Sequence, residues 1–180
     1  MEKAKDDGRG ALLWPEPAPT TMRIAEIAVV SPDLEVRKKF ISAICEETPL
    51  ETDRLLFGRL QINDQLVLHL YGLDYFEKDV SPTWDLVARK LLGYVVLFEW
   101  NREASFDAAS RTVDLLSAKY NLPIVIAATL PSASSALPES LLTAELALSD
   151  KGQFTFCQLS DPQSIKRVLI TLVNTVMEHM

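Results

Sequence analysis

The hydrophobic and polar residues of this chain alternate in segments that predict strands and helices in turn. Arg23–Val30 ends in a near-continuous apolar run, which is typical of a central parallel strand with both faces buried. Residues 34–45 then repeat apolar positions at helical spacing, and Ser31 or Asp33 is suited to cap this helix. The first part of the domain is therefore predicted to be a strand, a tight turn and an amphipathic helix.

The same alternation continues along the rest of the chain. Further strands are predicted at residues 54–62, 65–71, 93–100, 123–128 and 154–159. Further helices are predicted at residues 82–92, 105–120 and 138–148, and a last helix follows a cap at Ser160 or Asp161. Asn63 and Asp64 are expected to form a hairpin turn between the second and third strands. We therefore expect an α/β fold of three layers, in which helices cover both faces of a six-stranded, mostly parallel sheet with one antiparallel hairpin strand.

The chain divides into a tail and a single domain. Residues 1–21 are polar and contain Pro15, Pro17 and Pro19, which predicts a flexible N-terminal tail. Trp14 is the apolar exception, and it is expected to dock on the domain or on a partner. Residues 22–180 have the length and the apolar content of one domain.

Composition and charge narrow the range of partners. The 180 residues carry a net charge of −7, and nucleic-acid binding is not expected because it depends on Lys and Arg that neutralise phosphates. The longest apolar runs are too short to span a membrane. Cys45 and Cys157 lie in apolar contexts without metal-binding spacing, which favours reduced thiols in a cytoplasmic protein.

The turn after the first strand lies where a phosphate-binding loop would be. That loop has the pattern G-x-x-x-x-G-K-[ST], in which the glycines allow a tight turn and the last two residues reach phosphate and Mg²⁺. The corresponding positions are Ser31, Pro32, Asp33, Leu34, Glu35, Val36, Arg37 and Lys38. Both glycines are replaced, and Lys38 would repel a metal ion. Because the carboxylates of Asp33 and Glu35 stabilise a helix N-terminus, this loop is predicted to be a capped turn without a phosphate.

Five segments, taken in their order and spacing, resemble the Ras-like small GTPases. They are LFGRL at 56–60, LVLHLYG at 66–72, LGYVVL at 92–97, YNLPIV at 120–125 and SIKRVL at 164–169. The closest likeness is to bacterial and archaeal GTPases of the gliding-motility type, which are often encoded beside Roadblock proteins. This resemblance implies a Ras-like, P-loop NTPase-like fold with sites for GTP and Mg²⁺.

The other motifs that the resemblance implies are also replaced. Thr52 is the only counterpart of the first-switch threonine, in a shortened connection. Tyr75 and Phe76 lie near the places of the second-switch glycine and glutamine. The guanine-recognition motif is replaced by Thr129, Leu130, Pro131 and Ser132, which include no carboxylate. We therefore expect a degenerate pseudo-GTPase with no catalytic residue, no metal and no nucleotide cofactor.

Other enzyme chemistry is not predicted. The two histidines are His179, near the C-terminus, and His69, which is expected to pack within a strand. With so few histidines and cysteines, no nucleophile pair or metal cluster can be assembled.

Three functions remain open. The first is a non-catalytic interaction module that presents the former switch surface, residues 46–59 and 73–84, to a protein partner. Its candidate contact residues are Phe57, Tyr75, Phe76 and Trp84. The resemblance implies a Roadblock-type protein, a true GTPase or a second copy of this chain as the partner. The second function is a divergent but active nucleotide-binding switch in which Arg37 and Lys38 contact phosphate, and the third is a purely structural subunit.

Overall fold

The computed structural model of the protein describes residues 21–52, 55–74, 82–130 and 146–179. Eight strands form one sheet in the order β2-β3-β4-β1-β5-β6-β8-β7. Their bounds are β1 Arg23–Val30, β2 Leu50–Glu51, β3 Leu56–Asn63, β4 Leu66–Leu73, β5 Leu91–Glu99, β6 Ile124–Leu130, β7 Leu146–Ser149 and β8 Gly152–Gln158. The central strands β4, β1, β5, β6 and β8 run parallel, and antiparallel strands complete both edges.

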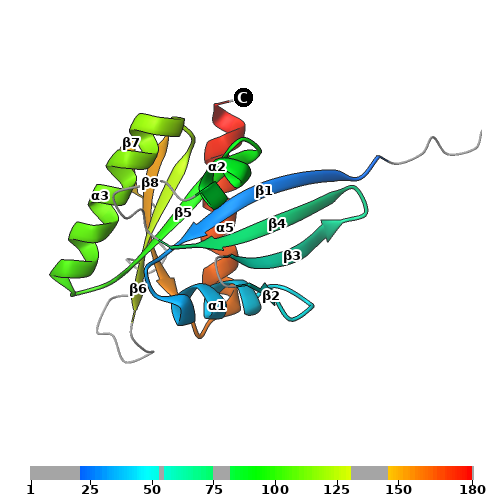
Figure 1. The fold of residues 1–180 in the computed structure, drawn as a ribbon, viewed down its shortest axis with the longest axis horizontal. Helices are drawn as coiled ribbons and strands as arrows, with labels where there is room; N and C mark the ends of the chain where they lie inside the picture. Colours follow the sequence, from blue (N-terminus) through cyan, green and yellow to red (C-terminus); the bar gives the residue numbers. More distant parts are fainter. Residues whose placement is uncertain (1–20, 53–54, 75–81, 131–145, 180) are drawn as a thin grey trace, which may run out of the picture.

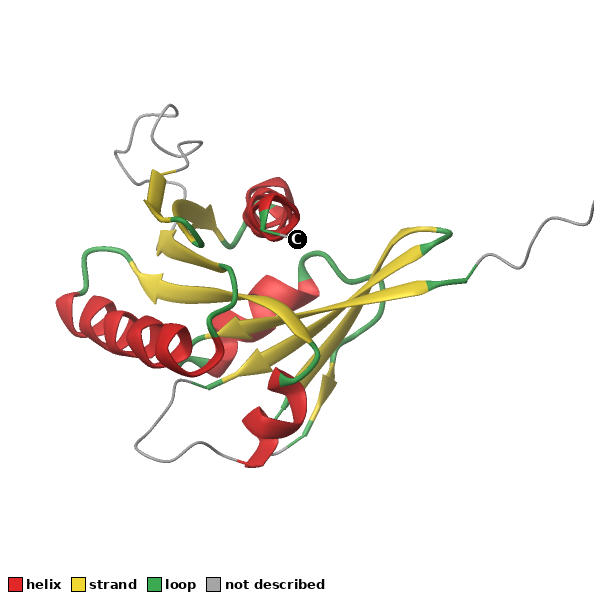
Figure 2. Cartoon of the chain, turned by 90° about the horizontal axis from the view of Figure 1, so that it is seen from above, coloured by secondary structure: helices red, strands yellow, loops and turns green. Residues whose placement is uncertain are grey.

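Helices cover both faces of the sheet, as the sequence predicted. The helices α1 (Leu34–Ser42) and α5 (Pro162–Glu178) pack on one face, and α2 (Pro82–Ala88) and α3 (Glu103–Tyr120) pack on the other. Figure 1 labels these elements, and Figure 2 shows the sheet between its two helical layers. The prediction of a mixed α/β fold with a mostly parallel sheet is therefore confirmed.

The strand β1 contributes to the core on both sides of the sheet. Ile27 and Val29 pack toward α1 and α5, whereas Ala28 and Val30 pack toward α2 and α3. All four are at most 1% exposed. This burial explains why the strand appears in the sequence as an unbroken apolar run.

Three of the described helix ends have identifiable caps, and two of these, Asp33 and Asp161, are among the cap residues that the sequence suggested. Asp33 caps α1, and Asp161 caps α5 by accepting a hydrogen bond of 2.9 Å from the backbone N–H of Gln163. Asn121 ends α3 in the left-handed conformation with φ of 49°. Among the described residues, no helix is long and apolar enough to cross a membrane.

The prediction of a six-stranded sheet is wrong, because the sheet has two further strands, one at each edge. β2 lies in the connection between α1 and β3, where no strand was predicted, and β7 begins inside the predicted helix 138–148. The remainder of that predicted helix lies outside the described residues, as does the predicted tail up to residue 20. With two and four residues respectively, these strands are too short for a periodic pattern, and pairing with β3 and β8 defines them.

The close approach of α1 to the sheet depends on a glycine. A Cβ atom added at Gly58 in β3 would overlap Ile41 Cγ2 and lie 2.8 Å from Cys45 Sγ. Ile41 is fully buried at the centre of the core on this face, so it has little room to move.

Replacing Gly58 by Ala is expected to lower the free energy of unfolding by about 1–3 kcal/mol, the usual cost of overpacking a core. Urea denaturation measures this change. Gly152→Ala is the matched control, because its added methyl would meet the Oγ of Ser149, which can rotate away. Equal stability of Gly58→Ala and the wild type would contradict the close packing of α1.

Candidate functional site

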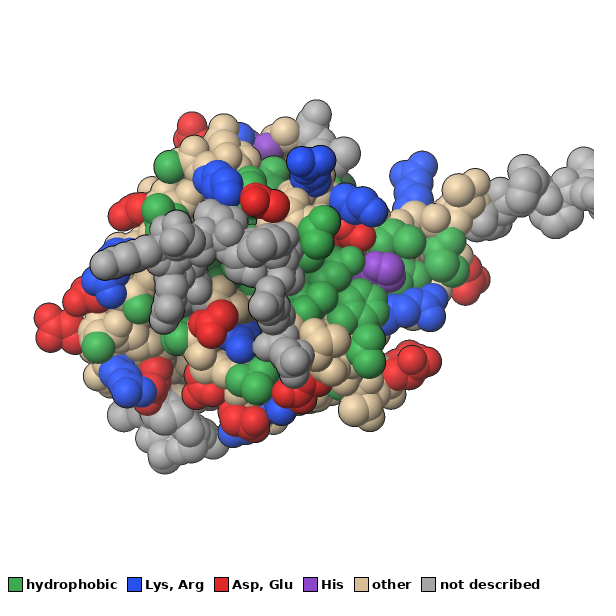
Figure 3. Space-filling view, in the orientation of Figure 1, with side chains coloured by type: hydrophobic (Ala, Val, Ile, Leu, Met, Phe, Trp, Pro, Cys, Tyr) green, Lys and Arg blue, Asp and Glu red, His purple; other side chains and the backbone are tan. Residues whose placement is uncertain are grey.

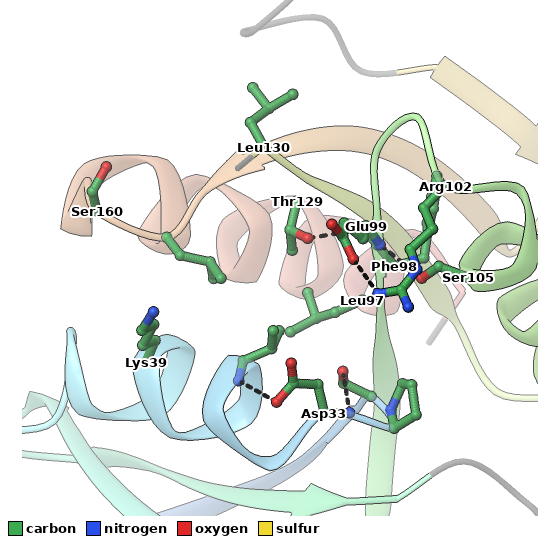
Figure 4. A pocket seen from close by; sticks show the side chains of 14 residues that line it. Asp33, Lys39, Leu97, Phe98, Glu99, Arg102, Ser105, Thr129, Leu130 and Ser160 are labelled. Atoms are coloured by element: carbon green, nitrogen blue, oxygen red, sulfur yellow. Dashed lines mark hydrogen bonds and ion pairs between the residues drawn. The ribbon is translucent and has the colours of Figure 1, made fainter. Parts of the chain in front are cut away.

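A cavity lies where the carboxyl ends of the central strands meet. It has a volume of about 630 Å³ and is lined by the turn after β1, the ends of β5 and β6, and the turn before α5. Figure 4 shows the side chains around it. The connection after β1 leads to the β3–β4 side of the sheet, whereas the connection after β5 leads to β6 on the other side. The edge between β1 and β5 is therefore the topological switch point, where parallel α/β sheets bind their ligands.

The turn after β1 satisfies its own amide groups. Asp33 Oδ1 accepts hydrogen bonds from the backbone N–H groups of Glu35 at 2.8 Å and Val36 at 3.4 Å. Ser31 Oγ in turn accepts a hydrogen bond from the backbone N–H of Asp33 at 3.2 Å. These N–H groups belong to the start of α1, where a bound anion would otherwise be held. The negative charge at the start of α1 therefore comes from the Asp33 side chain instead of a bound anion.

Arg37 points into the protein interior. It is 8% exposed, its Nη1 donates a hydrogen bond to the carbonyl of Ser31, and the same atom lies 3.6 Å from Asp74 Oδ1. Burial lowers the pKa of Arg37, and the nearby Asp74 and Asp33 carboxylates act in the opposite direction. The guanidinium thus joins the turn after β1 to the end of β4.

Lys38 is held on the other side of α1. Its Nζ lies 2.8 Å from Glu51 Oε2 on β2 and 3.7 Å from Glu35 Oε1. The hydrogen bond to Glu51 raises the pKa of Lys38. Lys38 therefore connects α1 to the edge strand β2.

Polar groups on the opposite wall of the cavity also form hydrogen bonds and an ion pair with one another. Arg102 Nη1 lies 2.8 Å from Glu99 Oε2, and the backbone N–H of Glu99 donates to Ser105 Oγ at 2.9 Å. Thr129 Oγ1 donates to the carbonyl of Phe98 at 3.0 Å, and Leu130 is buried beside it. Figure 4 shows these contacts across the cavity from Asp33. Pro131 and Ser132, the other residues at the predicted base-recognition position, lie outside the described residues.

A second cavity, of about 470 Å³, lies between α1, β2 and the end of β4. Arg37, Glu51 and Asp74 are among the residues that line it. Within the described part of the chain, the buried Nε of Arg37 has no hydrogen-bond partner. The same part of the chain contains no group of three or more His, Cys, Asp or Glu residues that could hold a metal ion.

The residues predicted for partner contact are placed in different environments. Trp84 is 4% exposed and packs near Tyr94, with ring centres 6.1 Å apart, so it belongs to the core. Phe57 is half-buried on β3, while Tyr75 and Phe76 lie outside the described residues. Two of the four predicted contact residues are described, and of these two Phe57 is partly exposed whereas Trp84 is not.

Phe57 belongs to a partly uncovered sheet face that the sequence did not single out. Its ring lies 5.0 Å from that of His69 and 5.5 Å from that of Tyr71 on β4. The Tyr71 hydroxyl donates to Glu26 Oε1 at 3.2 Å, and burial raises the pKa of Tyr71 to about 12. Ile24 on the same face is 57% exposed. Figure 3 shows hydrophobic side chains gathered beside a histidine in this region. We call these five residues the outer sheet face.

The register of the strands explains why this face was missed. Glu26 pairs with His69, and Phe57 pairs with Tyr71, so residues from three strands meet on one side. Period-two alternation along β4 places His69 and Tyr71 on one face. Their neighbours on β1 and β3 depend on the strand order, which single-strand patterns do not contain.

No protein-family description matches the sequence, and no curated protein is significantly similar to it.

Replacing Asp33 by Ala is expected to lower the free energy of unfolding by about 1 kcal/mol, because the cap of α1 is lost. Asp33→Asn is the matched control, since an asparagine oxygen can accept the same hydrogen bonds. Thermal or urea denaturation of the three proteins measures the difference. If Asp33→Ala were as stable as Asp33→Asn, the carboxylate would have no capping role.

Proposed function

We propose that this protein is a small-GTPase-like interaction module that neither binds nor hydrolyses GTP. The observation that carries the proposal is that the amides at the start of α1, the Nη1 of Arg37 and the Nζ of Lys38 are all bonded within the chain. Asp33 takes the amides at the start of α1, Arg37 binds Ser31 and Asp74, and Lys38 binds Glu51. To gain these contacts, a phosphate would have to displace a carboxylate of the same sign and break two ion pairs.

The arrangement of the strands supports the Ras-like part of this proposal. The antiparallel hairpin of β3 and β4 follows the first helix, with only the short β2 between them, and β4 pairs with β1 in parallel. Two of the five segments that carry the sequence resemblance, at 56–60 and 66–72, lie in this hairpin. The cavity beside Asp33 also lies at the edge of the sheet where a nucleotide would be expected.

The outer sheet face is the surface that we propose for a protein partner. It combines exposed aliphatic area at Ile24 with aromatic rings at Phe57 and Tyr71, and aromatic residues are enriched in protein interfaces. The partner suggested by the resemblance is a Roadblock-type protein, a true GTPase or a second copy of the chain. The purely structural subunit differs from this module only in being unstable without its partner.

Protein purified without added nucleotide is expected to release far less than one equivalent of GDP or GTP when it is denatured. The measurement is ion-exchange chromatography of the supernatant, calibrated with an active small GTPase carried through the same steps. Near-stoichiometric guanine nucleotide would refute the proposal.

Phe57→Asp is expected to abolish partner binding, because a charge would be placed among the aromatic rings of the outer sheet face. The matched control is Leu115→Asp, which introduces the same charge at a 51% exposed position on α3. Proteins that co-purify with tagged wild type and variants are quantified by mass spectrometry, and the melting temperature confirms that each variant folds. A partner retained by Phe57→Asp and lost by Leu115→Asp would assign binding to another surface.

One observation favours the alternative of an active nucleotide-binding switch. The unpartnered Nε of Arg37 lines the second cavity, and it is a donor that a phosphate oxygen could accept from. This alternative predicts a magnesium-dependent rise in melting temperature with GTP, about 5–10 °C when the ligand is at 100 times its Kd. It also predicts that Arg37→Met removes this rise.

A further inference from the structure

An apolar groove lies on the side of the sheet opposite the outer sheet face. It has a volume of about 410 Å³ and runs between the β3–β4 hairpin and α5. Its walls are formed by Leu60 and Ile62 of β3, Leu66 and Leu68 of β4, and Leu169 and Val173 of α5. Ile62 and the neighbouring Ile170 are 48% and 57% exposed. We call this the hairpin–α5 groove.

The groove lacks a cover among the described residues. A continuous apolar surface of this kind usually binds another segment or another protein, because its exposure to water is unfavourable. Lys166 is the one charged residue along the described lining, and Gln61 is the other polar one. The occupant should therefore be mostly apolar, with room for one negative charge at the edge.

The chain leaves the described fold beside this groove. The backbone N–H of Arg23 donates to the carbonyl of Gln65 at 2.7 Å, and Arg23 pairs with Leu66, a residue of the groove wall. Figure 1 shows the start of β1 at the same end of the molecule as the turn of the β3–β4 hairpin. Whatever precedes Thr21 therefore starts next to the groove.

The preceding sequence contains a segment with the required chemistry. Residues 11–15, Ala-Leu-Leu-Trp-Pro, form an uncharged apolar run in a stretch that is otherwise rich in charge and proline. Glu16 follows at once, and it is the only charged residue between Gly10 and Thr21. Residues 16–21 can span about 20 Å when extended. Along α5, Lys166 to Val173 covers about 10 Å, so the segment can reach the whole groove.

From this match of position, reach and chemistry, we propose that residues 11–15 of the same chain dock in the hairpin–α5 groove, with Trp14 and the leucines against its walls and Glu16 near Lys166. Docking of this segment covers the apolar surface from within the molecule. It does not depend on the proposed loss of nucleotide binding, because the groove shares no lining residue with the cavity at the strand ends.

Disulfide trapping in the full chain tests this proposal. A Glu16→Cys, Lys166→Cys variant is oxidised mildly and analysed by non-reducing electrophoresis and peptide mass mapping. The matched control is Glu16→Cys, Arg59→Cys, because Arg59 adjoins Leu60 on β3 but is directed to the opposite face of the sheet. The native thiols contribute little background, since burial raises the pKa of Cys45 to about 11 and that of Cys157 to about 12.

The proposal predicts that the groove pair forms an intramolecular disulfide about tenfold faster than the control pair, the ratio given by a docking free energy of about 1.4 kcal/mol. Adding Trp14→Ala should remove this preference, and Trp14→Phe should keep most of it. Equal rates for the two pairs would overturn the proposal. A disulfide-linked dimer would also overturn it, because the groove would then bind a second copy of the chain.

Discussion

The structure depends on the carboxylate of Asp33 at the start of α1. A helix N-terminus presents unpaired N–H groups and a partial positive charge, and something must satisfy both. In a phosphate-binding loop the ligand does so, whereas here Asp33 accepts from Glu35 and Val36. Because the chain supplies its own anion, the turn can dispense with the glycines that would bring the backbone close to a phosphate. The N-terminal amides of α1 therefore have an acceptor without a ligand, and the helix does not need an anion in the neighbouring cavity.

Two cationic residues of α1 connect this helix to other segments of the fold. Arg37 links the turn after β1 to Asp74 at the end of β4, and Lys38 links α1 to Glu51 on β2. The two contacts differ in how much they stabilise the fold, because Arg37 is buried whereas the Lys38–Glu51 pair is open to solvent and screened by it. Removing Arg37 would leave the Ser31 carbonyl without its donor inside the protein, which is more costly than losing an exposed pair. The same residues therefore hold together the turn after β1, the end of β4 and the edge strand β2.

Much of this arrangement could be predicted from the sequence, but not its lateral contacts. The strand β1 and the caps depend on local patterns: β1 was predicted with its observed bounds, and Asp33 and Asp161 were each one of two predicted cap residues. The edge strands β2 and β7 were missed because their partners specify them more than their own residues do. Missing β2 also concealed the pairing of Lys38, since Glu51 appeared to lie in a plain connection. The burial of Trp84 and the inward direction of Arg37 likewise depend on packing between distant segments.

The most direct measurement is nuclear magnetic resonance of the backbone amides of Glu35 and Val36 during titration with Mg²⁺ and GTP. If Asp33 holds these amides, their resonances will not move as GTP rises to millimolar concentration. The same resonances should shift in Asp33→Ala without any nucleotide, because their acceptor is lost. A saturable shift of both amides in the wild-type protein, dependent on Mg²⁺, would contradict the account, since a phosphate would then have replaced the carboxylate.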